Sequence, residues 1–287
     1  MKQPVIFYFI TLMMLLASCQ RPAGNQTEDD ATGTLFIIGG GSRPAGMVER
    51  MIEESGIRDT GYVAILPMSS SLPDSAIIWS GEQFYEQGMD RVAGFNFQHD
   101  QTPKEEWLDS LRKAPLIYIS GGNQNRFMNI VMDSPIMDAI HTAYANGAVI
   151  AGTSAGAAVM CEMMITGDEL RYEEYRSTFP VIEWDNIELA PGLGLLETAI
   201  VDQHFVWRSR HNRLITAVLE YPALPGIGID ESTAIIVNGN QAEVVGEAQV
   251  LVYTNPEGTQ TRYREKMGGE NLRLDIYLPG DIFAIQE

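Results

Sequence analysis

Cysteine, cationic residues and long apolar runs are all scarce in this chain of 287 residues, and each scarcity excludes a class of protein. Two cysteines do not support a disulfide framework, so a hydrophobic core must stabilise the fold, and 45% hydrophobic residues are enough for one. Lysine and arginine number 19 against 38 acidic residues, which gives a formal net charge of −19. Because such a surface repels phosphate backbones, we expect no nucleic acid partner.

The N-terminal apolar run, Val5 to Ala17, is too short for a comfortable membrane span and follows Lys2, as in a signal peptide core. It ends in LASC, which resembles a bacterial lipobox, and this resemblance implies a lipid on Cys19. We therefore expect a signal peptide over 1–18 and a polar tether over 19–32. The protein would then be an exported bacterial lipoprotein, anchored in a membrane at the periplasmic or the cell-surface face. An ordinary cleaved signal and a short anchor helix are the alternatives.

Apolar strands alternate with helices from residue 33 onward, as in a parallel sheet that is buried on both faces. These strands are expected at 34–38, 62–66, 91–97, 115–120, 148–151, 198–201 and 226–229. The main helices are expected at 44–55, 73–87, 104–113, 135–146 and about 208–220, and the stretch 163–197 reads as irregular. Antiparallel strands are expected at 233–237, 241–245, 249–253 and 271–278. We predict one α/β domain over 33–287, with a mainly parallel sheet covered by helices on both faces and C-terminal antiparallel strands.

Ser154 lies where an apolar strand meets a helix-forming run, within AVIAGTSAGAAVM at 148–160. The spacing GTSAG matches G-x-S-x-G, a tight turn that presents a serine hydroxyl above a sheet. Its small residues leave room for a strained backbone and for a substrate carbonyl. Because a five-residue match is common by chance, a close-packed turn without chemistry is the alternative.

Four predicted strands deliver Gln124, Ser154, His204 and Glu231 to one edge of the sheet, where binding crevices form in open α/β sheets. A serine hydroxyl needs a base to take its proton, and imidazole suits that role near neutral pH. A carboxylate then orients the imidazole. The sequence therefore predicts a Ser-His-acid arrangement with His204 as the base and Glu231 as the acid.

Other candidates for the acid are Glu169 and Glu173, which lie in an acidic, aromatic stretch that looks like a lid beside the serine. The remaining histidines have no setting comparable to that of His204; they are His99, His141 and His211. Cys161 is expected to pack as a small apolar residue.

Three segments together resemble the cyanophycinases: GTSAGAAVM at 152–160, DQHF at 202–205 with the arginines after it, and GIGIDE at 226–231. That family belongs with aspartyl dipeptidase (peptidase E), among serine peptidases on a flavodoxin-like, class I glutamine amidotransferase-like fold. The resemblance runs from about residue 34 to 253. It implies a catalytic triad of Ser154, His204 and Glu231 that hydrolyses β-aspartyl-linked peptides such as cyanophycin to β-Asp-Arg dipeptides.

The resemblance also implies a set of residues that line or brace the substrate site: Gln124, Asp202, Gln203, Arg208, Arg210 and Arg213. Asp202 is suited to pair with a guanidinium, and an arginine of the following helix is suited to clamp a carboxylate. At least one of the three arginines is expected to make a structural ion pair instead. Backbone N–H groups at Ala155 and near Gly122 are the natural oxyanion donors.

The chain departs from the common cyanophycinase pattern at Asn123 and at Gly41-Ser42-Arg43, which keeps another acidic or isoaspartyl peptide open as the substrate. A catalytically silent binding lipoprotein is the alternative from another class. Because the glycines at 39–41 lack a full G-x-G-x-x-G pattern, we expect no nucleotide, and we expect no metal or other cofactor. We expect these glycines instead to let the backbone pass close to the substrate cleft. Serine in place of cysteine disfavours a glutamine amidotransferase, and the resemblance allows a homodimer.

Overall fold

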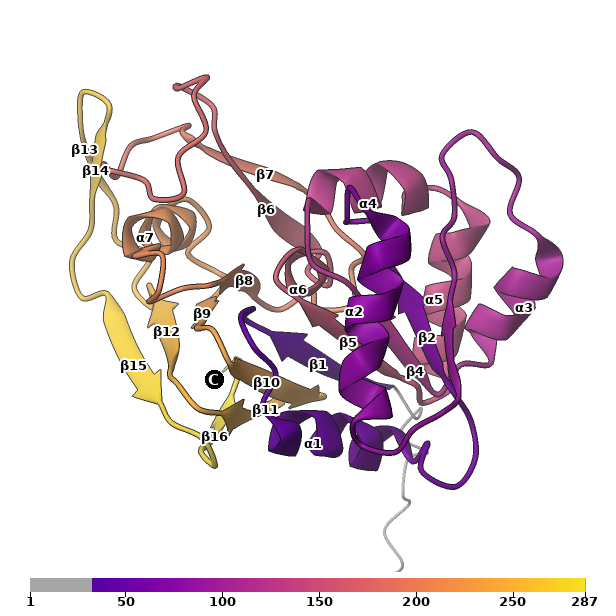
Figure 1. Cartoon of the computed structure of the whole chain (residues 1–287). Coiled ribbons are helices and arrows are strands. Elements are labelled where there is room, and N and C mark those ends of the chain that lie inside the picture. The colour runs from indigo at the N-terminus through magenta and orange to yellow at the C-terminus, as the bar shows by residue number, and fades with distance from the viewer. Residues whose placement is uncertain (1–32, 287) are drawn as a thin grey trace, which may run out of the picture.

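The computed structural model describes residues 33–286, so the predicted signal peptide, tether and Cys19 lie outside the described residues. Its large sheet has the strand order β16-β11-β10-β1-β5-β4-β2-β3 (Figure 1). Five neighbouring strands run parallel: β1 (Thr34–Ile38), β5 (Val149–Thr153), β4 (Leu116–Ile119), β2 (Val63–Leu66) and β3 (Val92–Gly94). Three antiparallel strands extend the sheet beyond β1: β10 (Thr233–Asn238), β11 (Gln241–Gly246) and β16 (Ile282–Ala284).

Both faces of this sheet are buried because apolar side chains occupy successive positions along its strands. In β1, Leu35 and Ile37 belong to one apolar cluster, and Phe36 and Ile38 to another. Helices contribute to both clusters: α1 (Ala45–Ser55) and α2 (Pro73–Tyr85) on the Phe36 side, and α3 (Glu105–Arg112), α4 (Gln124–Val131) and α5 (Pro135–Ala145) on the other. The predicted α/β architecture, with a large, mostly parallel sheet and antiparallel C-terminal strands, is confirmed.

A second sheet contains the strands predicted at 198–201 and 226–229, which the sequence had placed in the same parallel sheet as the others. Its order is β15 (Arg273–Tyr277), β12 (Val250–Thr254), β9 (Gly226–Ile229) and β8 (Ile200–Gln203), and β8 runs parallel to β9. One face joins the large core through Val201, Ile227 and Val252. The other packs against α7 (His211–Glu220), with Ile200 and Leu251 among the contacts. The crevice therefore lies between two sheets.

The stretch 163–197 is more regular than expected. It contains an antiparallel hairpin of β6 (Met163–Glu169) and β7 (Ile187–Pro191), which rises above α6 (Ala155–Ala158) in Figure 1. A small hairpin of β13 (Thr261–Tyr263) and β14 (Lys266–Gly268) was also not foreseen.

Because α7 begins at His211, Arg208 and Arg210 precede the helix and do not lie on its face. Within the part of the chain that is described, no helix is both long and apolar enough to cross a membrane.

Candidate active site

Ser154 occupies a sharp turn between β5 and α6, with φ of 54° and ψ of −112°. A side chain at Gly152 would place its Cβ 2.4 Å from the Gly156 carbonyl oxygen, and one at Gly156 would lie 2.3 Å from the Ile119 oxygen. The turn therefore needs both glycines of the G-x-S-x-G spacing. Its positive φ is a strained conformation of the kind found at functional sites, and it presents the serine at the end of the sheet.

His204 and Glu231 follow the ends of β8 and β9 and reach Ser154 from the second sheet. The Nε2 atom of His204 lies 2.8 Å from Ser154 Oγ, and Nδ1 lies 2.6 Å from Glu231 Oε1. Because a carboxylate only accepts, Nδ1 carries the proton in this arrangement and Nε2 is free to accept the serine hydroxyl. The structure thus brings together the three residues that the sequence analysis singled out.

The glycines at 39–41 make room for this arrangement. A Cβ at Gly40, where φ is +115°, would lie 2.2 Å from Cε1 of His204. A Cβ at Gly41 would lie 2.8 Å from that of Glu231. The backbone also fixes the histidine, because the His204 N–H donates to the Gly39 carbonyl oxygen at 2.7 Å. The close approach expected at these glycines is therefore made by the imidazole and the carboxylate themselves.

Burial lowers the pKa of His204 below its ordinary value of 6.5, and the positive charges of Arg208 and Arg210 lower it further. The hydrogen bond that His204 donates to Glu231 raises the pKa without overcoming the effect of burial. The imidazole is therefore neutral near pH 7, which is the state that accepts a proton.

The other candidate acids do not reach the imidazole. Glu169 is buried and accepts a hydrogen bond from Asn186 Nδ2 at 2.8 Å. Glu173 is exposed to solvent. Cys161 is fully buried, and burial raises its pKa to about 12, so it packs as an apolar residue as expected.

The predicted oxyanion donors flank Ser154. Ala155 is the first residue of α6, where a backbone N–H has no partner inside the helix. On the other side, a Cβ at Gly121 would lie 3.5 Å from that of Ser154, so residues 121 and 122 pass directly beside the serine. At Gly122 a Cβ would meet the Ser69 carbonyl oxygen at 2.2 Å, so a glycine is required there.

A cavity of about 420 Å³ opens on one side of Ser154, and we call it the arginine cavity. It is lined by Ser154, the predicted residues Gln124, Gln203, Arg208, Arg210 and Arg213, and residues of the β6–β7 hairpin. The Gln124 side-chain amide donates to the Ile165 carbonyl oxygen at 3.1 Å, which ties α4 to this hairpin.

Arg213 is locked in place beneath the arginine cavity. Its Nε donates to Asp202 Oδ2 at 2.8 Å, a second nitrogen donates to Oδ1, and both side chains are almost fully buried. Asp202 therefore braces the site from behind, and the expected pairing of Asp202 with a substrate guanidinium is wrong. Arg213 makes the expected structural ion pair, and Arg210 Nη1 also lies 3.5 Å from Asp202 Oδ1.

Arg210 is held by Gln203, whose backbone oxygen accepts from its Nη1 at 2.7 Å. Burial, together with the neighbouring charge of Arg213, lowers the Arg210 pKa to about 10. Arg208 differs from both, because its half-buried guanidinium has no hydrogen-bond or ion-pair partner within residues 33–286. Arg208 is the arginine that remains available to a bound carboxylate.

The hairpin contributes lining residues that the sequence analysis missed, Asp168 and Tyr175. Of the described residues that line the arginine cavity, Asp168 is the one that is acidic. The loop between β6 and β7 is fixed to the backbone at Arg208, because Thr178 Oγ1 donates to the Arg208 carbonyl oxygen at 2.7 Å. The composition of the loop indicated a lid, but only the pairing of β6 with β7 shows which of its acids faces the cavity.

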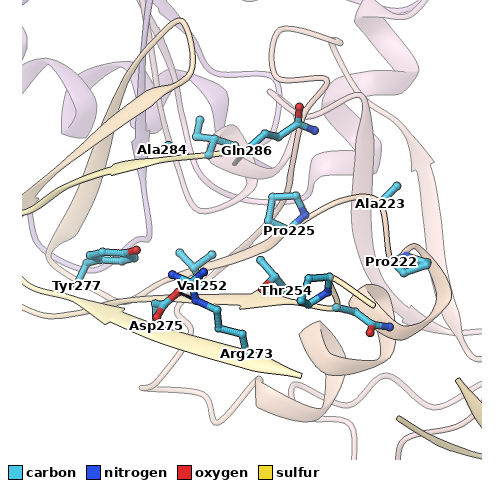
Figure 2. A pocket seen from close by; sticks show the side chains of 13 residues that line it. Pro222, Ala223, Pro225, Val252, Thr254, Arg273, Asp275, Tyr277, Ala284 and Gln286 are labelled. Atoms are coloured by element: carbon cyan, nitrogen blue, oxygen red, sulfur yellow. Dashed lines mark ion pairs between the residues drawn. The ribbon is translucent and has the colours of Figure 1, made fainter. Parts of the chain in front are cut away.

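A second cavity of about 320 Å³ opens on the other side of Ser154, and its lining includes Arg43, Tyr118 and His204. Figure 2 shows a third cavity, of about 270 Å³, between the second sheet and the C-terminal segment. There Arg273 and Asp275 form an ion pair at 2.7 Å. None of its described lining residues borders either cavity at Ser154. The two cavities beside the serine are therefore the candidate substrate subsites.

The layered α/β fold and the Ser-His-Glu geometry together define a serine hydrolase. The chain belongs to peptidase family S51, whose sequence profile matches residues 35–245, and it is a serine peptidase. It is 34% identical over 236 residues to the cyanophycinase of Trichormus variabilis, covering 79% of this chain and 76% of that one. It is 29% identical over 268 residues to the cyanophycinase of Synechococcus elongatus, covering 88% and 80%.

Solved structures of other peptidases share the fold. A peptidase from an acI-B1 Actinobacterium aligns with a TM-score of 0.62 at 20% identity, covering 88% of this chain and 97% of that one. A putative peptidase E protein from Listeria monocytogenes aligns with a TM-score of 0.53 at 16% identity, covering 76% and 100%. At these identities the likeness concerns the fold alone.

Proposed function

We propose that this chain is an exopeptidase that uses Ser154, His204 and Glu231 to hydrolyse β-aspartyl-linked peptides such as cyanophycin, releasing β-Asp-Arg dipeptides. The observation that carries the proposal is the hydrogen-bonded chain from Ser154 Oγ through the imidazole to Glu231, with distances of 2.8 and 2.6 Å. The cyanophycinases among its relatives support the substrate class.

In the proposed reaction, Ser154 Oγ attacks the scissile carbonyl carbon while its proton passes to Nε2 of His204. Glu231 stabilises the resulting imidazolium. The backbone N–H groups of Gly122 and Ala155 stabilise the oxyanion. The imidazolium then gives its proton to the leaving nitrogen, the C–N bond breaks, and an ester on Ser154 remains. Water attacks that ester with His204 as base, which frees the carboxylic acid and restores the serine.

The arginine cavity suits the acyl half of the substrate. Arg208 has no partner within the described residues and can bind, through two parallel hydrogen bonds, the free α-carboxylate that the arginine of a β-aspartyl-arginine unit carries. Asp168 is exposed and lines the same cavity, where it can receive a guanidinium. One cavity therefore offers both charges that a β-aspartyl-arginine unit needs.

An aspartyl or isoaspartyl dipeptidase acting on other acidic peptides is the second candidate. It is favoured by the charge of the arginine cavity, which three arginines and a single acid line. A silent binding lipoprotein is disfavoured, because binding alone does not require a serine hydroxyl paired with a neutral imidazole.

The test is release of β-Asp-Arg from purified cyanophycin by the full chain, compared with Ser154→Ala and with Ser177→Ala at an exposed serine. Release that is lost only in Ser154→Ala supports the proposal. Labelling of Ser154 by a serine-reactive phosphonate without release would redirect the activity to other acidic peptides. If the protein shows no release and Ser154 is not labelled, the enzymatic proposal is overturned.

A further inference from the structure

The second cavity at Ser154 lies on the side where the leaving group must depart. His204 lines this cavity and is absent from the lining of the arginine cavity. Under the proposed mechanism, on which this inference rests, the imidazolium returns its proton to the leaving nitrogen and must lie beside it. We call this space the leaving-group cavity; its lining includes Arg43, Tyr118, Ser120, Gly121, Ser154 and His204.

Arg43 gives the leaving-group cavity a fixed positive charge. Among the described lining residues Arg43 is the one permanently charged side chain, and no acidic residue accompanies it. Its Nε donates to Gln83 Oε1 at 2.8 Å and its Nη1 to the Gly41 carbonyl oxygen at 3.0 Å. Its Nη2 has no partner within residues 33–286. The guanidinium is thus positioned by the protein while one of its donor groups remains unused.

Tyr118 offers a second unused donor. It is fully buried on β4, it lines the leaving-group cavity, and its hydroxyl has no hydrogen-bond partner within the described residues. Buried hydroxyls rarely lack a partner, and an anionic oxygen in the cavity would supply one. The neighbouring Ser120 is also buried, and its hydroxyl makes only a long contact of 3.4 Å with a backbone oxygen.

We propose that the leaving-group cavity binds a carboxylate of the residue that follows the scissile bond, with Arg43 as the specificity-determining residue and Tyr118 as a supporting donor. A cation placed directly beside Arg43 is disfavoured, because like charges repel and no acid among the described lining residues balances Arg43. A terminal α-carboxylate and an acidic side chain offer the same chemistry. The enzyme therefore prefers leaving residues that carry a carboxylate near the new amine.

The test uses aspartyl dipeptides, each made with an α and a β linkage, whose leaving residue is leucine, leucine amide or glutamate amide. For the full chain we expect kcat/KM for the leucine peptide to exceed that for leucine amide by about tenfold or more. In Arg43→Met this ratio should fall close to one, and Arg43→Lys should retain part of it. If the glutamate amide peptide has the kcat/KM of the leucine peptide, a side-chain carboxylate can take the place of the terminal one. If it has the kcat/KM of the leucine amide peptide, the cavity binds only the terminal carboxylate.

Arg112→Met, on the outer side of α3, removes a charge away from both cavities and should keep the full ratio. Phosphonate labelling of Ser154 shows whether Arg43→Met is folded. Tyr118→Phe, a milder change, should lower the ratio severalfold.

Equal rates on leucine and leucine amide would overturn this inference alone, as would an Arg43→Met variant that slows both equally. Hydrolysis of none of these peptides by a protein whose Ser154 is labelled would also overturn it. Absence of both hydrolysis and labelling would overturn the proposed function as well.

Discussion

Arg208 acts on the base His204 and, under the proposed function, would also bind the substrate. Its guanidinium lowers the pKa of His204 through charge repulsion with the imidazolium. Removing that charge in Arg208→Met should raise the imidazole pKa, so the base form is lost at a higher pH. We expect the acid limb of the kcat/KM profile, which reports the free enzyme and lies below pH 6.5 in the unmodified protein, to move to higher pH. The binding loss should separately lower kcat/KM for a substrate with a free carboxylate by roughly 10–100-fold.

Arg208→Lys is the matched control, because it keeps the positive charge and loses the two parallel hydrogen bonds that a guanidinium donates to a carboxylate. Its acid limb should stay where it is while kcat/KM still falls. An acid limb that does not move in Arg208→Met would show that the charge of Arg208 has no effect on the His204 pKa.

Gly40 leaves no space for a side chain beside the imidazole. In Gly40→Ala the new methyl group would start 2.2 Å from His204 Cε1, at a φ of +115° that alanine rarely adopts. We expect the imidazole to be displaced and kcat to fall by about 100-fold or more. Circular dichroism would separate this displacement from unfolding, and phosphonate labelling of Ser154, which needs the imidazole as base, should be lost together with the activity.

Gly46→Ala provides the comparison, because a Cβ at Gly46 in α1 meets nothing within 4 Å. That variant should keep full activity and be unchanged or slightly more stable, by up to about 1 kcal/mol. A Gly40→Ala variant with full activity would contradict the assigned position of the imidazole.

At this scale the sequence predicted the residues that follow strand ends, Ser154, His204 and Glu231, because strand ends can be read from apolar runs. It gave Arg43 only as part of a departure from the cyanophycinase pattern that bears on the substrate, without a role of its own, and it did not predict Tyr118 at the site. Arg43 comes near Ser154 because β1 pairs with β5, and Tyr118 because β4 pairs with β5 on its other side. Nothing in the local pattern around either residue specifies those neighbours.

At the scale of elements, the β6–β7 hairpin was missed because its strand pattern is broken. The register shifts between Ile165 and Glu169, and Gly167 adopts a φ of +100°. A bulge of this kind interrupts the alternation of apolar and polar residues by which a strand is predicted. The same bulge lies beside the arginine cavity, where Gly167 and Asp168 are lining residues. The irregularity that hid the strand is therefore part of the candidate site.

The ion pair of Asp202 with Arg213 joins β8 to α7, and it should be a major stabilising contact between these elements. Asp202→Asn leaves the Arg213 guanidinium buried without a counter-charge, since the exposed fraction of its side chain is 2%. We expect the free energy of unfolding to fall by about 3–5 kcal/mol, measured by urea denaturation. Glu243→Gln breaks the half-exposed pair with Arg50 and should cost less than about 1 kcal/mol. Equal losses in the two variants would contradict this difference in burial.

At the scale of the whole molecule, the layers of the fold could be predicted but the division into two sheets could not. Apolar strands alternating with helices indicate a parallel sheet with both faces covered, and β1 to β5 conform. The strands β8 and β9 are also short and apolar, so their sequences resemble those of the central strands. Their partner β12 comes from the alternating C-terminal part of the chain, and such a pairing between distant segments has no local signal.

The net charge of −19 contrasts with the arginines at the site. Of the 19 cationic residues, Arg43, Arg208, Arg210 and Arg213 line the two cavities beside Ser154. Because exposed charges are screened beyond about 10 Å at 0.1 M salt, the acidic surface has little effect on a ligand already in contact with these arginines. Recognition of a carboxylate is therefore compatible with an acidic protein, provided that the contact is short-range and partly buried.

The N-terminal 32 residues lie outside the described part of the chain, and their sequence carries the last prediction. We propose that Cys19, at the end of the lipobox-like LASC, becomes lipidated and holds the catalytic domain at a membrane through the polar tether. In a bacterial host fed labelled palmitate, the full chain should incorporate label and sediment with membranes, because acyl chains partition into the bilayer. Cys19→Ala should lose the label, whereas Cys161→Ala, at a buried thiol, should keep it. Label retained in Cys19→Ala would overturn the anchor, and label lost in both variants would trace the loss to misfolding.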